Sequence, residues 1–337
     1  MTLITYPTRV HFADDVLQEA LQSELESIRC QAPLIVFENR LVESEFLFRV
    51  MEGMPRKTEP TSLSFAKSSN LSAVAKGVVG DELNPDVVIA FGSARAIELG
   101  RKCRYVLTQK FKKRPSLFAI PGIDGLPGPC TRNLETWRSG LPTVLICDPT
   151  VTLNAEPAQS WRSTTLSLVR CIESYLATAY NPPADGMALD ALSRCVANFP
   201  RIGPEPKLEL HRELMAAGLN ASLSQEKGIG PTLTLAAALA GQGDALDEAD
   251  LAGVILPSVI KRQAMDQDKV DVLMKVVGGP EVSLDAALGR LIETAPMPKT
   301  LSALGLSQDS IEEAAQSVNG KADLDYQSAR QILETVF

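Results

Sequence analysis

Through the first half of the chain, short apolar runs alternate with segments whose apolar residues recur at helical spacing. The runs are compact and bounded by Pro, Gly or Asp, which is typical of buried parallel strands. They cover Pro33–Phe37, Asp86–Phe91, Ser116–Pro121 and Thr143–Pro149. The intervening segments predict helices over Asp15–Ser27, Glu43–Met54, Leu71–Val79 and Ser93–Cys103. This alternation predicts a parallel sheet with helices on both faces.

After Pro149 the pattern becomes helical only, and breakers such as NPP, IGPEP and GIGP separate the segments. Helices are predicted over Ser163–Ala179, Asp185–Phe199, Glu209–Leu223, Leu233–Gly241, Glu248–Gln263, Lys269–Val277, Leu284–Glu293, Gln308–Ser317 and Tyr326–Phe337. We therefore expect an α/β domain of nucleotide-binding type over residues 1–152 and an all-helical domain over residues 153–337.

Composition and net charge exclude some classes of binding partner. The 337 residues suffice for two domains at about 150 residues each. A net charge of −8 argues against binding to nucleic acid or to anionic membranes, because both need clustered Lys and Arg. We find no apolar run of about 18 residues and no signal peptide. Six scattered cysteines without a CxxC pair are typical of reduced thiols, so a cytoplasmic protein is expected.

The sequence also constrains the chemistry, because it contains only two histidines, His11 and His211. A His-rich metal site is therefore excluded, and a Ser-His or Cys-His pair would need one of these two residues. His211 opens a long helical segment, so we expect it to be exposed. Asp148 ends a strand before Pro149 and is expected to act as a turn or cap residue.

Several motifs resemble those of the iron-containing alcohol dehydrogenase family, which includes the maleylacetate reductases. The opening YPTRVHFADD resembles the first strand of that family, and DVVIAFGSARAIELGRK resembles its strand followed by GGGSxxDxxK. GLPTVLICDPTVT resembles its strand ending in Asp-Pro, and NPPADGMALDAL is similar to its NPxADxxALxAL. GVILPSVI and the C-terminal PMPKTLSALGLSQDSIEEAA complete a resemblance that covers nearly the whole chain in order.

The resemblance implies a dehydroquinate-synthase-like fold and a small-molecule ligand in a cleft between the two domains. It also implies a homodimer or a larger assembly, and a heteromer with a paralogue is an alternative. In the family, glycines after the strand and the following helix N-terminus bind the cofactor pyrophosphate. A divalent ion is held by an Asp and a His four residues apart on one helix, and by two further His residues.

The metal ligands of the family are missing from this sequence. The Asp and His fall on Leu166 and Arg170, and the later His positions fall near Leu233, Ala237 and Glu248. A Leu cannot ligate a cation, and an Arg would repel one. We therefore expect no metal ion. We expect Arg170 to pair with a carboxylate of the loop over residues 244–250, most plausibly Glu248. The pair would act either as a catalytic anion or carbonyl binder or as a structural clamp.

The cofactor motifs are reduced in the same way. Only Gly92 and Ser93 remain of the first glycine loop, and Phe91 places a bulky residue where the backbone must approach a cofactor. The loop either still binds an anion or is a simple strand-to-helix turn. Glu38 ends a strand where an acidic residue can accept ribose hydroxyls, which would favour NAD, or it faces solvent. Asp124 lies in the second loop, PGIDGLPGPC, a candidate pocket wall.

No cofactor is established by these motifs, and NAD is the candidate that Glu38 favours. Three functions agree with the sequence. The first is a metal-independent oxidoreductase that acts on a small carbonyl or carboxylate compound, with Arg170 and Glu248 as its catalytic candidates. The second is a non-redox enzyme of lyase, dehydratase or isomerase type in the same cleft. The third is a catalytically inactive partner of an active paralogue.

Overall fold

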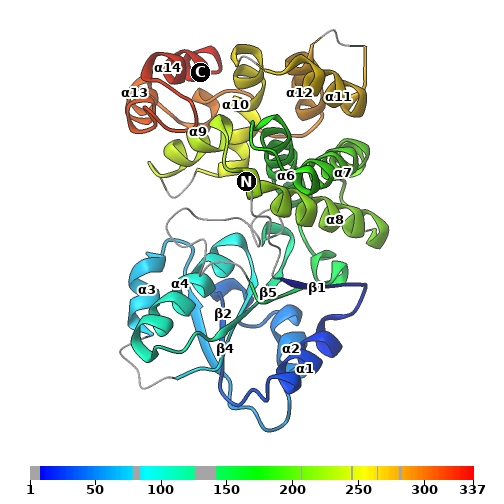
Figure 1. Cartoon of the computed structure of the whole chain (residues 1–337), viewed down its shortest axis with the longest axis vertical. Helices are drawn as coiled ribbons and strands as arrows, with labels where there is room; N and C mark the ends of the chain where they lie inside the picture. The colour runs from blue at the N-terminus through cyan, green and yellow to red at the C-terminus, as the bar shows by residue number, and fades with distance from the viewer. Residues whose placement is uncertain are drawn as a thin grey trace. The chain divides into compact units, whose positions relative to one another are not determined.

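The structure is a computed structural model that describes residues 8–78, 84–125, 142–205, 207–243, 246–263, 265–280 and 283–337 (Figure 1). Its internal contacts divide the chain into two compact units. The α/β unit extends to Ala155 and includes the segment Glu205–Met215. The helical unit comprises Glu156–Pro204 and Ala216–Phe337. Helix α8 (Leu208–Ser224) therefore begins in one unit and ends in the other.

The described part of the α/β unit contains a six-stranded, all-parallel sheet in the order β1-β6-β5-β4-β2-β3. Its strands are β1 (Arg9–Phe12), β2 (Pro33–Glu38), β3 (Thr61–Phe65), β4 (Val87–Gly92), β5 (Ser116–Pro121) and β6 (Val144–Cys147). The predicted parallel sheet is confirmed. Strand β3 was not predicted, because its polar sequence TSLSF forms an edge strand that alternates between half-buried and exposed residues.

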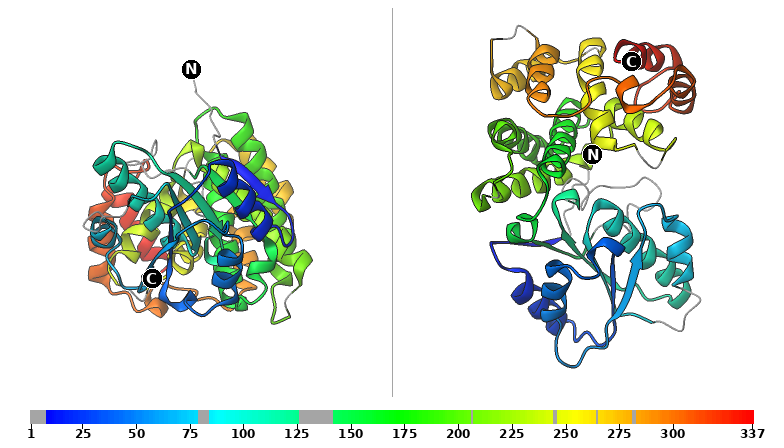
Figure 2. Two further views of the ribbon diagram at one scale, coloured as in Figure 1. Left: turned by 90° about the horizontal axis from the view of Figure 1, so that it is seen from below. Right: turned by 180° about the vertical axis from the view of Figure 1, so that it is seen from behind.

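Helices cover both faces of this sheet, as predicted (Figure 2). The elements are α1 (Leu17–Ser27), α2 (Glu45–Glu52), α3 (Leu71–Gly77) and α4 (Ala94–Phe111), with short 3-10 helices η1 (Asn39–Leu41), η2 (Ile123–Gly125) and η3 (Pro149–Thr152). Helices α1 and α2 pack on alternate strand residues such as Phe37 and Phe91. Helix α4 packs on the other face, where a Cβ at Gly100 would lie 2.6 Å from that of Ala90.

Asp148, at the end of β6, is fully buried and forms hydrogen bonds with the start of α1. Its carboxylate accepts the backbone N–H groups of Asp15 and Leu17, at 2.9 and 3.1 Å, and the guanidinium of Arg49 at 2.8 Å. It also caps η3 by accepting the N–H of Thr150. The predicted cap role is confirmed, and Asp148 additionally compensates a buried cation.

His211 is buried and not exposed, contrary to the sequence-based expectation. Its Nδ1 lies 2.9 Å from Oγ1 of Thr152, which follows β6 in the same unit. Burial lowers the pKa of this imidazole. The prediction failed because α8 packs its first turns onto the α/β unit, a contact that helical periodicity does not reveal.

The helical unit contains α6 (Pro157–Leu176), α7 (Pro182–Asn198), the end of α8, α9 (Pro231–Ala240), α10 (Glu248–Arg262), α11 (Gln267–Val277), α12 (Leu284–Glu293), α13 (Gln308–Ser317) and α14 (Tyr326–Thr335), with 3-10 helices η4 (Phe199–Arg201), η5 (Gln225–Lys227) and η6 (Ser302–Leu304). Helix α10 is buried nearly all round and forms the centre of the unit. The predicted fold class is confirmed. Within the described ranges, none of the helices combines the length and apolarity needed to cross a membrane.

Candidate functional site

The predicted cofactor residues gather at the carboxyl edge of the sheet. The β2–β4 register pairs Val36 with Ala90, so Glu38 and Gly92 lie side by side where these strands end. The backbone of η2, which contains Asp124, approaches from β5. A Cβ at Gly125 would lie only 2.2 Å from the carbonyl oxygen of Gly92, so this contact requires a glycine.

The turn between β4 and α4 keeps the geometry of an anion-binding loop. Gly92 has φ +103°, a left-handed conformation that favours glycine. Ser93 is the N-cap of α4, and its Oγ accepts the N–H of Ala96 at 3.3 Å. The first N–H groups of a helix lack intrahelical acceptors and carry the positive end of the helix dipole. This turn can therefore hold a phosphate group.

Phe91 does not obstruct the loop, which corrects the sequence-based interpretation. Its side chain is fully buried on the α1–α2 face of the sheet. It stacks on Phe37 with ring centroids 5.1 Å apart and contacts Phe46 at 4.9 Å. Because side chains alternate between the two faces of a strand, Phe91 belongs to the core while the backbone of Gly92 remains at the edge.

Glu38 is 6% exposed, so the interpretation of a solvent-facing residue is wrong. The Nε of Arg40 donates to its Oε2 at 3.0 Å. The second carboxylate oxygen can serve as an acceptor at the strand end. Asp124 is placed in η2 by its backbone, and its side chain lies outside the described part of the structure.

The positions that correspond to the family's metal ligands do not form a donor set. Leu166 and Arg170 are half-buried on α6, Leu233 is buried in α9, Ala237 is exposed on α9, and Glu248 is the half-buried first residue of α10. Apart from Glu248, these side chains are hydrocarbon or cationic and cannot ligate a metal ion. Among the described residues, no group of three or more His, Cys, Asp or Glu side chains is placed to hold a metal.

Arg170 contacts a residue of η5 that was not predicted. Its Nη1 donates to Oε1 of Gln225, a buried residue of η5. The first turn of α10 pairs with Arg162, whose Nη2 lies 2.8 Å from Oδ2 of Asp250. Arg162 precedes Arg170 by about 12 Å along α6 at the usual helical rise. The pair of Arg170 with Glu248 therefore stays a prediction, while Arg162 is a cation that contacts the start of α10.

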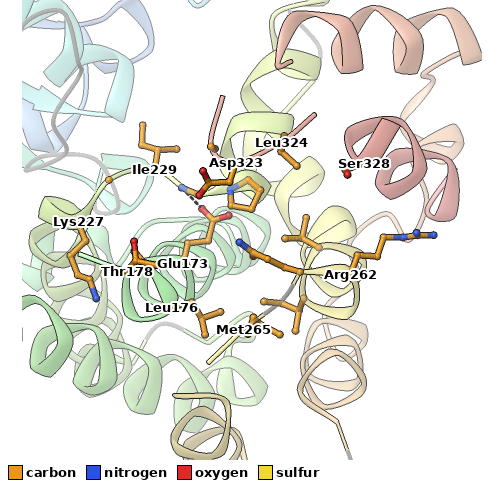
Figure 3. A pocket seen from close by; sticks show the side chains of 18 of the residues that line it. Glu173, Leu176, Thr178, Lys227, Ile229, Arg262, Met265, Asp323, Leu324 and Ser328 are labelled. Atoms are coloured by element: carbon orange, nitrogen blue, oxygen red, sulfur yellow. Dashed lines mark hydrogen bonds between the residues drawn. The ribbon is translucent and has the colours of Figure 1, made fainter. Parts of the chain in front are cut away.

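The structure adds Glu173, one turn beyond Arg170, which sequence reasoning treated as a packing residue. Its carboxylate accepts the N–H groups of Gly230 and Thr232, at 3.1 and 2.5 Å, at the start of α9. It is 7% exposed, and burial raises its pKa to about 7, against the hydrogen bonds from Thr232 and Gly230, which lower it. Glu173 lines a cavity in the helical unit (Figure 3). A Glu among the apolar residues of a buried helix face was the available signal.

Solved structures of other proteins share this fold. No protein family model matches the chain. The chain has the fold of an iron-containing alcohol dehydrogenase from Corynebacterium glutamicum, with a TM-score of 0.82, 18% identity, and 100% of this chain and 98% of the other covered. It is equally similar to a sulfoacetaldehyde reductase from Bifidobacterium kashiwanohense, solved in complex with NAD+, with a TM-score of 0.82, 16% identity, and 100% and 99% covered.

A relationship at the level of sequence accompanies this fold. The chain is 23% identical to a 4-hydroxybutyrate dehydrogenase from Cupriavidus necator over 354 residues, which cover 93% of this chain and 92% of the other. The relationship to the iron-containing alcohol dehydrogenase family, predicted from the motifs, is thereby confirmed.

Proposed function

We propose that this protein is an oxidoreductase of alcohol dehydrogenase type that uses NAD and acts on a small carbonyl or carboxylate compound without the family's metal ion. The observation that carries the proposal is the turn at Gly92 and Ser93, which combines a left-handed glycine, a capped helix N-terminus and a bulky neighbour, Phe91, packed away from the edge. A sequence relative named for 4-hydroxybutyrate oxidation and a structural neighbour solved with NAD+ support it.

In this proposal the α/β unit binds the cofactor. The first N–H groups of α4 bind a pyrophosphate oxygen. Gly92 and Gly125 approach each other closely and have no side chains, so only backbone atoms face the cofactor at this edge of the sheet. The carboxylate of Glu38 accepts a ribose hydroxyl, which favours NAD over NADP. The bound nicotinamide supplies the hydride acceptor.

In the helical unit, Arg170 takes the place of the metal ion as the group that stabilises negative charge on the substrate. With NAD bound, oxidation of a substrate alcohol would transfer the hydride of its carbon to the nicotinamide and release the hydroxyl proton to water, leaving an aldehyde. Arg170 stabilises the negative charge that develops on that oxygen, because a guanidinium donates hydrogen bonds and keeps its charge at neutral pH. Gln225 orients Arg170, and its own amide Nε2 is buried with no hydrogen-bond partner among the described residues, so it can donate to the same oxygen or to a substrate carboxylate.

Calorimetric titration with NAD and NADP tests the cofactor assignment. We expect one NAD per chain and weaker binding of NADP. Arg95→Glu places a negative charge on the exposed second residue of α4 and should weaken NAD binding about five- to tenfold. The matched control is Lys57→Glu, an exposed residue that precedes β3 and therefore belongs to the amino edge of the sheet.

Turnover is tested with 4-hydroxybutyrate and NAD before and after treatment with a chelator, and we expect NADH formation that chelation does not reduce. If no binding is detected at millimolar NAD, the proposal is rejected in favour of a non-redox enzyme or an inactive partner subunit. If chelation abolishes turnover, the metal-independent part of the proposal is wrong.

A further inference from the structure

The helical unit contains a cavity of about 880 Å³ that belongs to none of the cofactor or metal-derived positions. It is formed by the end of α6, the start of α9, the end of α10 and the turn before α14 (Figure 3). Cavities of this size bind small organic molecules. Its lining is about equally polar and apolar, and the apolar part includes Leu176, Ile229, Val259, Ile260, Leu324 and Ile332.

The basic side chains that touch this cavity are committed elsewhere. The Nζ of Lys227 is buried and lies 2.5 Å from Oδ1 of Asp185. Lys269 donates to the carbonyl oxygens of Tyr175 and Ala177 at 2.8 Å each, and so caps the end of α6. Arg262 extends away from the cavity and donates to side chains of α14 (Figure 3). Their charges are therefore largely satisfied by the protein itself.

The buried carboxylate of Glu173 is not balanced in this way. Among the described residues, no Lys, Arg or His forms an ion pair with Glu173, although its side chain is more than nine-tenths buried. Its compensation comes from the two N–H groups at the start of α9. A buried carboxylate normally requires a cation, because a helix N-terminus supplies only about half a unit charge. Burial is the main cause of the raised pKa of Glu173, which is about 7. The hydrogen bonds offset this effect only in part.

Two further acids lie at the rim of the same cavity. Asp323 is exposed, and its left-handed backbone, with φ 58°, belongs to a tight turn that directs it toward the cavity mouth (Figure 3). Asp266 caps α11 by accepting the N–H of Asp268. The cavity thus presents a buried acid, two acids at exposed positions, and apolar side chains beside polar ones.

We propose that this cavity binds a protonated organic amine whose ammonium group pairs with Glu173 and whose apolar body lies against Leu176 and Ile260. The amine supplies the cation that Glu173 lacks, and Asp323 favours its entry through long-range attraction. The site is independent of the proposed oxidoreductase activity, so either proposal can fail without the other.

Hexylamine tests this assignment, with hexanol and hexanoate as probes of equal length but different charge. Binding is followed through the carbon-13 methyl resonance of Met265, which lines the cavity and is assigned with Met265→Leu. We expect hexylamine to bind at least tenfold more tightly than hexanol, and hexanoate more weakly still. Equal binding of hexylamine and hexanol would overturn the proposal, since the cavity would then select only for apolar bodies.

Two variants separate the roles of the acids. Glu173→Gln should reduce the affinity for hexylamine tenfold or more and leave that for hexanol unchanged. Asp323→Asn should reduce it about two- to fivefold, and it preserves the turn because Asn tolerates a left-handed backbone. The matched control, Asp309→Asn, removes an exposed charge from α13 and should have no effect. Unchanged hexylamine binding in both cavity variants contradicts the proposal.

Discussion

Arg170 of α6 donates a hydrogen bond to the side-chain oxygen of Gln225, at the position where the resemblance to the family predicts a metal-binding histidine. The substitution replaces a ligand for a cation by a cation, so any ligand that now binds there must be an anion or a polarised oxygen. Gln225 is neutral, so this hydrogen bond orients the guanidinium without neutralising its charge. This relationship makes Arg170 the residue whose replacement is most informative.

Replacing Arg170 tests its role in turnover. Arg170→Met should lower kcat/KM for 4-hydroxybutyrate by a factor on the order of 100 or more, since removal of one oxyanion donor typically has that effect. The affinity for NAD should remain unchanged. Arg170→Lys should recover part of the rate, and Arg201→Met, an exposed arginine of η4, is the control. A rate unaffected in Arg170→Met would assign this residue to structure alone.

Asp148 and Asp15 contact the same nitrogen of Arg49, so replacing each in turn compares how much a buried and an exposed carboxylate contribute to the free energy of unfolding. Asp148 is fully buried, and Asp148→Asn leaves the guanidinium without its buried counterion, so unfolding should become easier by about 3–5 kcal/mol. The side chain of Asp15 is 80% exposed, and Asp15→Asn should cost less than about 1 kcal/mol. Urea unfolding followed by circular dichroism measures both, and comparable losses would contradict the assignment.

Gly230 permits the contact between Glu173 and the start of α9. A Cβ at residue 230 would lie 2.5 Å from the carboxyl carbon of Glu173, so Gly230→Ala should destabilise the chain by about 1–3 kcal/mol. Gly186→Ala is the control, because that Cβ would meet nothing within 4 Å inside α7. It should stabilise the helix by about 0.5–1 kcal/mol. Thermal unfolding distinguishes the two directions.

The buried carboxyl of Glu173 also predicts a pH dependence of stability. Its pKa is raised from 4.5 to about 7, so between these values the folded chain binds the proton more tightly than the unfolded chain. Its contribution is therefore present in acid and is lost as the pH rises through this interval, by about 3 kcal/mol in total. The difference in unfolding free energy between the protein and Glu173→Gln, measured from pH 5 to 8, should follow this trend. A difference independent of pH would show that the carboxyl titrates normally.

Much of the fold could be predicted because it depends on local patterns. Compact apolar runs marked four of the six strands, and breakers such as NPP at residues 181–183 marked the helix boundaries. Strand β3 was not predicted, because an edge strand need not be apolar. Asp148 was predicted as a cap because Asp before Pro has few other local roles.

The site depended more strongly on contacts between distant segments. The orientation of Phe91 followed from which face of the sheet α1 and α2 cover, and its residue type did not determine it. The register of α6 decided which segments its two arginines contact: Arg170 donates to Gln225 of η5, and Arg162, two turns earlier, donates to Asp250 of α10.

The amino-acid sequence alone was sufficient to establish an α/β unit followed by a helical unit, and it predicted that the metal-binding positions of the resembled family lack their ligands here. These conclusions rest on periodicity and on which residue types occur, both of which are local properties. Only the tertiary structure showed an open turn at Gly92 and a buried Glu173 without a cationic partner. Burial and pairing arise from segments far apart in the chain, so the free energy of a charge depends on neighbours that the local sequence does not contain.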